Sequence, residues 1–380
     1  MTFQDFWPAN EQASSQKWDA HVLRGYVAEL WKTNRDTAQR ILDAAYEHPG
    51  LQPVFVQLQA SMELDERGAA RLIGAVKAEM SPVWQFGYLK FGRVTAELQG
   101  GTLKELLLAI STAPGGWGVA VEILHMRIFA DRSANRPLDC EIIEAAYALM
   151  GAATFARTNR EQLDHELAEI AKSCLASGDA EGVAASLATN LRQASIDQIR
   201  NWSEHVDLLR VLLEFHPIAV LDALFEGLEE EKWIDTFEYL VGHRGNPLDV
   251  VPPQVLVEWC DAAPTVRYKI AATLVRFSGR ADVGGLLRWS EQAVALLENP
   301  RGRKVVLEKF IDRFTPRSWR GSRAVLIEAN AKLLDAAELS LPPELRSYAA
   351  AEKTRLLEEA ARERRSEEER DRERDERFEP

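Results

Sequence analysis

The stretch LLEFHPIAVLDALFEGLEEEKWIDTFEYLV, from Leu212 to Val241, reads as one complete helix-turn-helix unit. Two apolar series in it recur at helical spacing, so each helix has one apolar stripe and a polar back. The first series comprises Val220, Leu221, Leu224, Phe225 and Leu228, and the second comprises Trp233, Phe237, Leu240 and Val241. A lone pair of helices cannot bury two such stripes, which predicts further pairs stacked against it.

Weaker copies of this pattern recur along the chain. The segment LLEFHP at 212–217 resembles LLENP at 296–300, and looser copies surround Pro49 and Pro114. Each copy consists of a helix end, a turn containing proline and a new amphipathic helix. Because the spacing between copies is irregular, the pattern favours a degenerate helical solenoid over a strict one.

The predicted fold is therefore all-α, an irregular α-solenoid of stacked helical hairpins with a charged C-terminal helix. We expect a loose N-terminal arm (1–15), an N-terminal helical-repeat region (16–200), a C-terminal helical-repeat region (201–340) and a long charged helix (341–380). No segment clearly predicts a strand. Aromatic residues alternate from Val83 to Val94 as in a strand, but the length and surroundings favour a short irregular helix.

Composition excludes several classes of protein. With 46% hydrophobic and 28% charged residues the chain is foldable, and its net charge of −13 argues against wholesale coating of nucleic acid. The longest uncharged run, Leu106 to Val121, is interrupted by Pro114-Gly115-Gly116, so we expect no membrane span. Three widely separated cysteines and no secretory signal predict a reducing, cytoplasmic location.

The best candidate for a functional surface is the basic segment from Arg301 to Arg323. It has eight basic residues against two acidic ones, a net charge of +6. The basic residues are Arg301, Arg303, Lys304, Lys309, Arg313, Arg317, Arg320 and Arg323. Guanidinium groups suit phosphate because they donate hydrogen bonds in a fixed fork. We expect this segment to bind a protein partner or, as a second possibility, nucleic acid.

A simpler interpretation of the same segment stays open. Its arginines would pair with acidic neighbours in the stack, while Phe310 and Phe314 belong to the core. Under this interpretation the segment is a solvated helix face and binds no ligand.

Motifs for catalysis or cofactor binding are not found. The chain has no GxxxxGK[ST], no GxGxxG after a strand and no HExxH, so we expect no enzyme activity, no cofactor and no metal. One loose cluster, His125, Asp139, Cys140, Glu141 and Glu144, has no diagnostic metal spacing. We interpret it as a core cysteine with surface carboxylates.

The segment from Arg362 to Arg377 is almost entirely charged, with seven basic and eight acidic residues among sixteen. Pairs four residues apart, such as Glu368 with Arg372, support a single exposed helix. Without apolar heptad positions a coiled coil is not predicted. Docking to a partner through Phe378 is the alternative use of this tail.

The sequence resembles two classes of known protein. The helix pairs separated by proline turns are similar to HEAT or armadillo repeats, a family that presents curved surfaces to proteins or nucleic acids. The segment WRGSRA at 319–324, its following helix and the charged tail resemble the C-terminal helical ends of large bacterial multidomain proteins, some of them phage-defence proteins. The resemblance implies a non-catalytic scaffold or adaptor in a bacterial multi-protein assembly.

An alternative function follows from the same family. HEAT-like DNA glycosylases use stacked helices with a basic concave face and an aromatic residue beside an acidic one. In this chain Trp233 with Asp235, or Trp259 with Asp261, would fill those roles. A nucleic-acid-binding protein, including a glycosylase-like enzyme, is therefore the second expectation.

Overall fold

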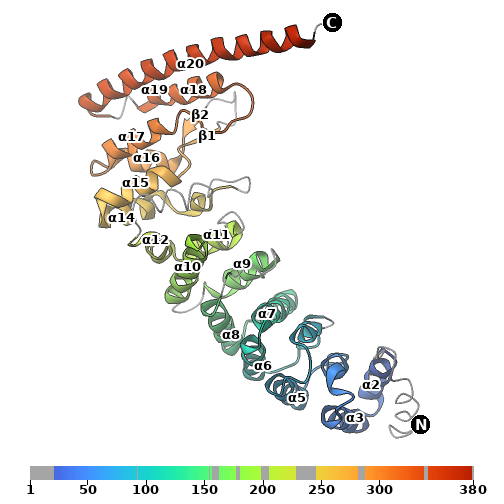
Figure 1. The fold of residues 1–380 in the computed structure, drawn as a ribbon. Coiled ribbons are helices and arrows are strands. Elements are labelled where there is room, and N and C mark those ends of the chain that lie inside the picture. The colour runs from blue at the N-terminus through green and yellow to red at the C-terminus, as the bar shows by residue number, and fades with distance from the viewer. Residues whose placement is uncertain are drawn as a thin grey trace. The chain divides into compact units, whose positions relative to one another are not determined.

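A computed structural model describes residues 21–91, 93–153, 155, 162–176, 180–197, 205–227, 245–280, 287–337 and 341–378. These residues are mainly helical, which confirms the predicted all-α class (Figure 1). The chain divides into two units, residues 1–200 and 201–380. No described helix is long and apolar enough to cross a membrane. The predicted arm (1–15) and the second helix of the Leu212–Val241 stretch lie outside the described residues.

In unit 1, each helix contacts helices close to it in the chain. Its elements are α2 (His21–Thr33), α3 (Arg35–Glu47), η1 (Gln52–Val54), α4 (Phe55–Gln59), α5 (Glu66–Lys77), η2 (Val83–Lys90), α6 (Gly100–Thr112), α7 (Gly116–Ser133), α8 (Cys140–Gly151), α9 (Gln162–Cys174) and α10 (Glu181–Ile196). Helix α6, for example, packs against α5, α7 and α8, and α8 packs against α9 and α10. The short irregular helix predicted after Ser81 is the 3₁₀ helix η2.

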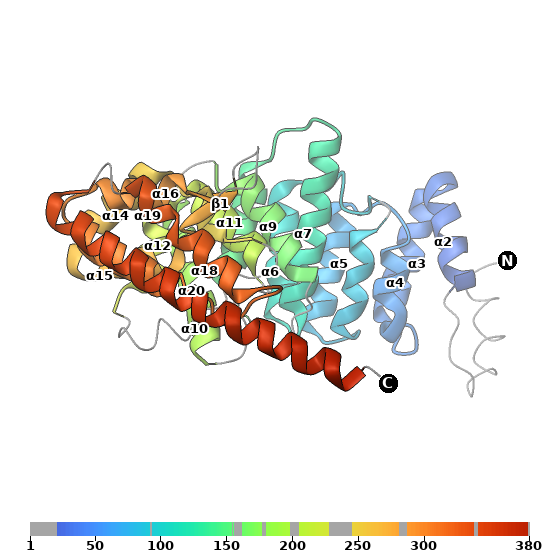
Figure 2. The same cartoon turned by 90° about the horizontal axis from the view of Figure 1, so that it is seen from above.

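Unit 2 is built in the same way. Its elements are α11 (Val206–Phe215), α12 (Pro217–Phe225), η5 (Pro247–Val250), α14 (Pro253–Ala262), α15 (Pro264–Leu274), β1 (Ser278–Arg280), β2 (Leu287–Trp289), α16 (Glu291–Glu298), α17 (Arg303–Asp312), α18 (Arg323–Ala331), α19 (Leu333–Ala337) and α20 (Pro343–Phe378). Helix α14 packs against α15 and α16, and α15 packs against α17. The predicted charged helix is α20, which packs along α18 and extends beyond it (Figure 1, Figure 2).

The proline turns separate helices where the sequence predicts. Helix α11 ends at Phe215 and α12 begins at Pro217, while Pro49, Pro114 and Pro300 lie in the turns after α3, α6 and α16. Proline is tolerated at the first helical position because the N–H that it lacks would have no partner there. At each of these four prolines, one helix ends and the next begins after a short turn.

One short hairpin departs from the expectation that no strand is present. Strands β1 and β2 pair antiparallel, with Ser278 opposite Trp289. The hairpin separates two helices, because α15 ends at Leu274 and α16 begins at Glu291. The start of α16 is set by Ser290, whose Oγ accepts a hydrogen bond from the backbone N–H of Ala293 at 3.1 Å.

Glycine is required where α6 turns into α7. Gly115 has φ +76°, in the left-handed region, and a Cβ on Gly116 would lie 1.8 Å from the carbonyl oxygen of Ile110. The Gly115-Gly116-Trp117-Gly118 run therefore forms a tight helix entry.

Buried polar side chains connect helices that are distant in sequence. Arg127 Nη1 donates to the carbonyls of Thr95 (2.6 Å) and Leu98 (3.0 Å). In unit 2, Gln292 Nε2 donates to the carbonyls of Leu248 (2.6 Å) and Val251 (2.7 Å). The bonds of Arg127 span 29–32 residues and those of Gln292 span 41–44 residues. Each bond therefore joins a helix to the segment that precedes its own helical pair.

We expect Arg127→Met to destabilise unit 1 strongly. Arg127 forms an ion pair with Asp131 at 2.7 Å, and both side chains are at most 9% exposed. Removing one partner of a buried pair costs about 3–5 kcal/mol. Chemical denaturation should show this loss. Arg132→Met is the matched control, because its pair with Glu169 is 53% and 35% exposed and such pairs contribute less than about 1 kcal/mol. Equal stability of the two variants would contradict this role of Arg127.

Candidate interaction surface

The basic segment 301–323 runs from the turn before α17, through that helix and the following loop, into the start of α18. Near the start of the segment, the backbone of Gly302 packs closely on Tyr268. A Cβ at this position would lie 2.1 Å from the tyrosine ring. Phe310 and Phe314 are fully buried, as in the simpler interpretation. Their rings pack on Phe277 and Trp289, with centroids 5.2–6.1 Å apart.

Arg303 and Arg313 bind the carbonyl ends of other helices. Arg303 Nε donates to the carbonyl of Leu297 at 2.7 Å, at the end of α16. Arg313 Nη1 donates to the carbonyls of Ala272 (2.7 Å) and Val275 (2.8 Å), at the end of α15. The last carbonyls of a helix have no partner within it, and a cation there also interacts favourably with the helix dipole.

Burial distinguishes Arg313 from an arginine that awaits a ligand. Its guanidinium lies 5.2 Å from the ring centroid of Phe277. Desolvation lowers the pKa of Arg313 to about 10, which still leaves it charged at neutral pH. Although Arg313 lies four residues after Lys309, its guanidinium turns inward toward the end of α15.

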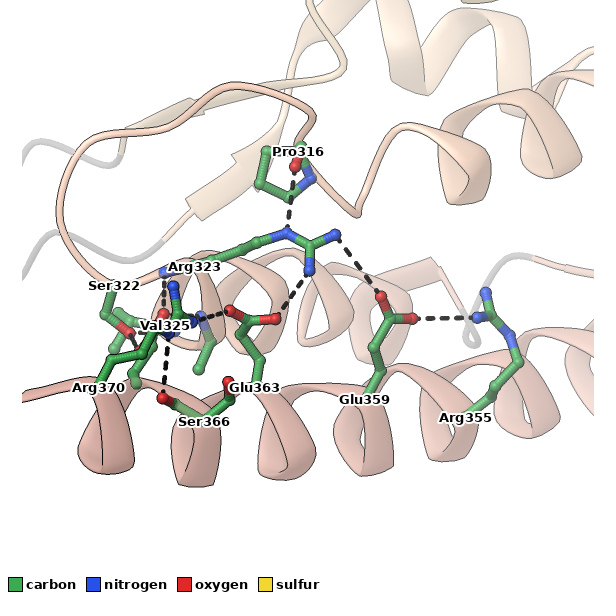
Figure 3. A network of polar contacts seen from close by, with 11 residues as sticks. Pro316, Ser322, Arg323, Val325, Arg355, Glu359, Glu363, Ser366 and Arg370 are labelled. Atoms are coloured by element: carbon green, nitrogen blue, oxygen red, sulfur yellow. Dashed lines mark hydrogen bonds and ion pairs between the residues drawn. The ribbon is translucent and has the colours of Figure 1, made fainter. Parts of the chain in front are cut away.

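Arg323 holds α20 against α18 (Figure 3). Its guanidinium lies 2.9 Å from a carboxylate oxygen of Glu363 and 3.9 Å from one of Glu359. It also donates to the carbonyl of Pro316 at 3.3 Å, which ties the loop before α18 to the same cluster. The beginning of the charged tail, at Glu363 and Glu367, is thus packed against α18. The expectation of one wholly exposed helix is wrong for this part.

The first turn of α18 is capped from two sides. Ser322 Oγ accepts from the N–H of Val325 at 3.1 Å and donates to Glu367 at 2.6 Å. Glu367 also accepts from the N–H groups of Arg323 (2.7 Å) and Ala324 (3.3 Å). The hydrogen bond from Ser322, followed by those from the two backbone groups, lowers the pKa of Glu367 below its ordinary value.

Two further basic residues lie near carboxylates at the surface. Arg301 approaches Asp261 at 3.6 Å and Lys304 approaches Glu308 at 3.9 Å. The side chains of Arg301 and Lys304 are each more than 60% exposed, so these ion pairs contribute little to stability. Lys309 is half-buried.

The remaining basic residues of the segment, Arg317 and Arg320, lie in the loop before α18. We call this loop together with the first turn of α18 (residues 315–326) the α17–α18 corner. Arg317 and Arg320 are exposed, and Trp319 between them is 42% exposed. The Arg323 guanidinium lies 5.1 Å from the centroid of the Trp319 ring. Val325 (55% exposed) and Leu326 (36%) are further exposed apolar side chains, in the first turn of α18. Sequence reasoning missed these last two, although they fall outside the helical stripe of Ala324, Ile327 and Ala331.

The loose acidic cluster in unit 1 divides in the structure. Asp139, Cys140 and Glu141 have ligand atoms within 4.8 Å of one another, whereas Glu144 pairs with Lys104 and His125 packs against the His165 ring. Hydrogen bonds from Asp139 and then Cys140 lower the pKa of Glu141 to about 2. Cys140 is exposed, so the interpretation of this residue as a core cysteine is wrong. Exposed acidic groups such as these are common without a metal ion.

The glycosylase-like pair Trp259 and Asp261 faces other helices. Trp259 is 2% exposed and its Nε1 donates to Asp222 at 2.8 Å. Asp261 accepts from the Tyr268 hydroxyl at 2.8 Å, and the burial of Tyr268 together with this bond raises the pKa of its hydroxyl. These contacts give both residues a packing role. The other pair, Trp233 and Asp235, lies outside the described residues.

We expect Glu367→Gln to destabilise the first turn of α18. The substitution removes the negative charge but keeps the size and shape of the side chain. A carboxylate at a helix N-terminus contributes about 0.3–1 kcal/mol, so the Ala324 and Val325 amides should exchange roughly two- to fivefold faster. Hydrogen exchange read by NMR or mass spectrometry measures this, with the exposed neighbour substitution Glu368→Gln as control.

The pH dependence has a definite sign. Because the pKa of Glu367 is lowered on folding, its contribution is complete at neutral pH and disappears as the pH falls through that lowered value. Thermal stabilities of wild type and Glu367→Gln should therefore converge in acid. A difference that persists there would contradict a role for the charge.

Comparison with known proteins identifies no relative of this chain. No family model, no curated protein and no solved structure matches it. Its function is therefore inferred from its own surfaces, and among the basic residues predicted from sequence the α17–α18 corner is the part that presents exposed cations beside exposed apolar side chains.

Proposed function

We propose that this protein is a non-catalytic helical adaptor that binds an acidic partner protein through the α17–α18 corner. The observation that carries the proposal is the exposed Trp319, with exposed Arg317 and Arg320 near it in the loop and exposed Val325 and Leu326 in the following first turn of α18. Tryptophan and arginine are the residues most enriched among those that dominate binding energy at protein interfaces. Apolar side chains bordered by cations fit a partner with an apolar anchor and nearby carboxylates.

The corner is held in place before any partner arrives. Arg323 fixes the loop at Pro316 and contacts the Trp319 ring, while Glu363 and Glu367 fix Arg323 and the first turn of α18. An ordered surface loses less conformational entropy on binding than a loop that must first be ordered. This supports recognition by a preformed surface.

The charge distribution favours a protein over nucleic acid as the partner. Arg303, Arg313 and Arg323 are engaged with carbonyls and carboxylates, and Glu363 and Glu367 lie beside the corner. Two phosphates neutralised by Arg317 and Arg320 would give a salt slope of only about −2, against about −10 for a strong DNA-binding protein. Nucleic acid remains the second candidate because an exposed Trp319 ring can stack on a base.

The adaptor proposal includes an architecture and a location. Side-chain bonds between partners about 30–45 residues apart support an irregular HEAT-like solenoid, whose repeats have similar lengths. Cys140, Cys174 and Cys260 form no disulfide with one another, which supports a reducing compartment, the cytoplasm. The place in a bacterial multi-protein assembly, and in phage defence, rests on the resemblance of the C-terminal sequence.

A double variant tests the corner. Trp319→Ala with Arg320→Glu removes the central ring and reverses a charge, and residues of this kind commonly contribute 2 kcal/mol or more. Affinity purification from the native host, with quantitative mass spectrometry, should show at least a roughly 30-fold weaker recovery of the specific partner. The identified partner should then bind the purified wild-type protein directly.

The control reverses charge elsewhere in the same unit. Arg288→Glu with Lys332→Glu changes two exposed basic residues outside the corner and should leave recovery unchanged. Equal recovery by corner and control variants would refute the proposal. Fluorescence anisotropy with single- and double-stranded DNA at two salt concentrations tests the second candidate, which requires binding that the corner variant loses.

A further inference from the structure

Helix α20 packs on α18 and α19 with few apolar contacts of its own. Among its described side chains, those that are fully buried are Ala349, Leu356 and Ala360. One leucine and two methyl groups remove little apolar surface from water, and hydrophobic stabilisation is roughly proportional to that surface. The docked position of this helix therefore depends largely on its polar contacts.

These polar contacts recur along the face of α20 that meets its neighbours. They are the ion pairs Lys353–Asp335, Glu359–Arg323, Glu363–Arg323 and Arg364–Glu328, together with the hydrogen bond between Ser322 and Glu367. Figure 3 shows the central group, in which Glu359 and Glu363 both point toward Arg323. The basic side chain of each pair is 22–44% exposed, so solvent and salt reach these pairs. Such pairs are individually weak, and dissolved salt weakens them further.

Some of the same contacts order the α17–α18 corner. The Arg323 guanidinium, which Glu363 contacts, lies 5.1 Å from the centroid of the Trp319 ring. Glu367 accepts hydrogen bonds from the backbone N–H groups of Arg323 and Ala324, in the first turn of α18. If α20 leaves α18, these amides lose their acceptor and Arg323 loses its carboxylates. The order of the corner therefore depends on the position of α20.

The Arg364–Glu328 pair joins α20 to α18 outside the corner. Glu328 lies in the second half of α18, beyond residues 315–326, and the two side chains are 2.6 Å apart. Breaking this pair therefore changes the docking of α20 without altering a corner residue.

We propose that α20 is an ionic strap, which docks reversibly on α18 and α19 and thereby sets the order of the α17–α18 corner. Regions with few buried apolar contacts open at a low free-energy cost. Rising ionic strength, or the loss of one distant pair, shifts α20 to the undocked state, and the corner loosens with it. The consequence for binding rests on the proposed function: the partner binds the corner only while α20 is docked.

A charge swap outside the corner tests the strap in the full chain. Arg364→Glu places a carboxylate beside Glu328 and should release α20, whereas adding Glu328→Arg restores an ion pair of opposite polarity and should dock it again. Hydrogen exchange of the Arg323, Ala324 and Val325 amides reports on the corner. We expect exchange at least fivefold faster in Arg364→Glu and wild-type exchange in the swapped double variant.

The position of α20 is measured separately by electron spin resonance. Spin labels are attached at Lys332→Cys and Arg362→Cys, both exposed positions, in a Cys140→Ser background that lacks the exposed native thiol. We expect one narrow distance distribution for the wild-type strap. It should broaden with Arg364→Glu, and also in about 1 M salt, where the Debye length is about 3 Å.

Arg365→Glu is the matched control. Arg365 is exposed and lies nine residues after Leu356, which places it on the opposite face of α20. The substitution changes the charge by the same amount as Arg364→Glu at the neighbouring position. It should alter neither the distance distribution nor the exchange of the corner amides.

The outcomes separate the strap from the proposed function. An α20 that stays docked in Arg364→Glu and in 1 M salt would overturn the ionic strap, and release of α20 without faster exchange would overturn its coupling to the corner. Neither measurement involves a partner. If the strap responds as expected but the partner binds Arg364→Glu as tightly as wild type, the strap stands and the corner is not the binding surface.

Discussion

The carbonyl groups at helix ends impose the main constraint on this fold. A chain of many short helices has many ends, and the last carbonyls of each helix have no partner inside it. In unit 2, Gln292 and Arg313 supply that partner at the ends of η5 and α15, from 38–44 residues away. In unit 1, Arg127 binds carbonyls of a turn in the same way, those of Thr95 and Leu98. The same bonds join segments that are distant in sequence, so satisfying the backbone and packing the helices are one process.

This constraint determines what a basic residue can do in the chain. An arginine beside a helix end is occupied by carbonyls, and burial then makes its charge unavailable to a ligand, as for Arg313. Arg323 is occupied by α20 in a comparable way. Clustering in sequence therefore overstates the cationic surface. Arg317 and Arg320 are exposed on either side of an exposed tryptophan in the sequence, a combination suited to the protein partner that we propose.

Much of the fold could be predicted from the sequence because apolar periodicity and proline both act locally. The turns at Pro49, Pro114, Pro217 and Pro300 are examples, since each proline sets a helix boundary through its own geometry. The β1–β2 hairpin could not be predicted, because each strand has only three residues and β1, Ser278–Arg280, contains no apolar side chain that would mark a strand. Its last residue, Trp289, is fixed by a hydrogen bond to the carbonyl of Leu333, which lies 44 residues away.

The candidate site was predictable in composition but not in geometry. Eight basic residues identify the segment, yet Lys309 and Arg313, four apart on one helix, have different surroundings because α15 ends beside only one of them. The role of α20 depends on the same kind of distant contact. A tail of alternating charges looks fully solvated in sequence, but Glu363 and Glu367 fall on the side that meets α18 and Arg323. Charge in this protein acts first to join helices, and only the part that stays exposed is available for the partner that we propose.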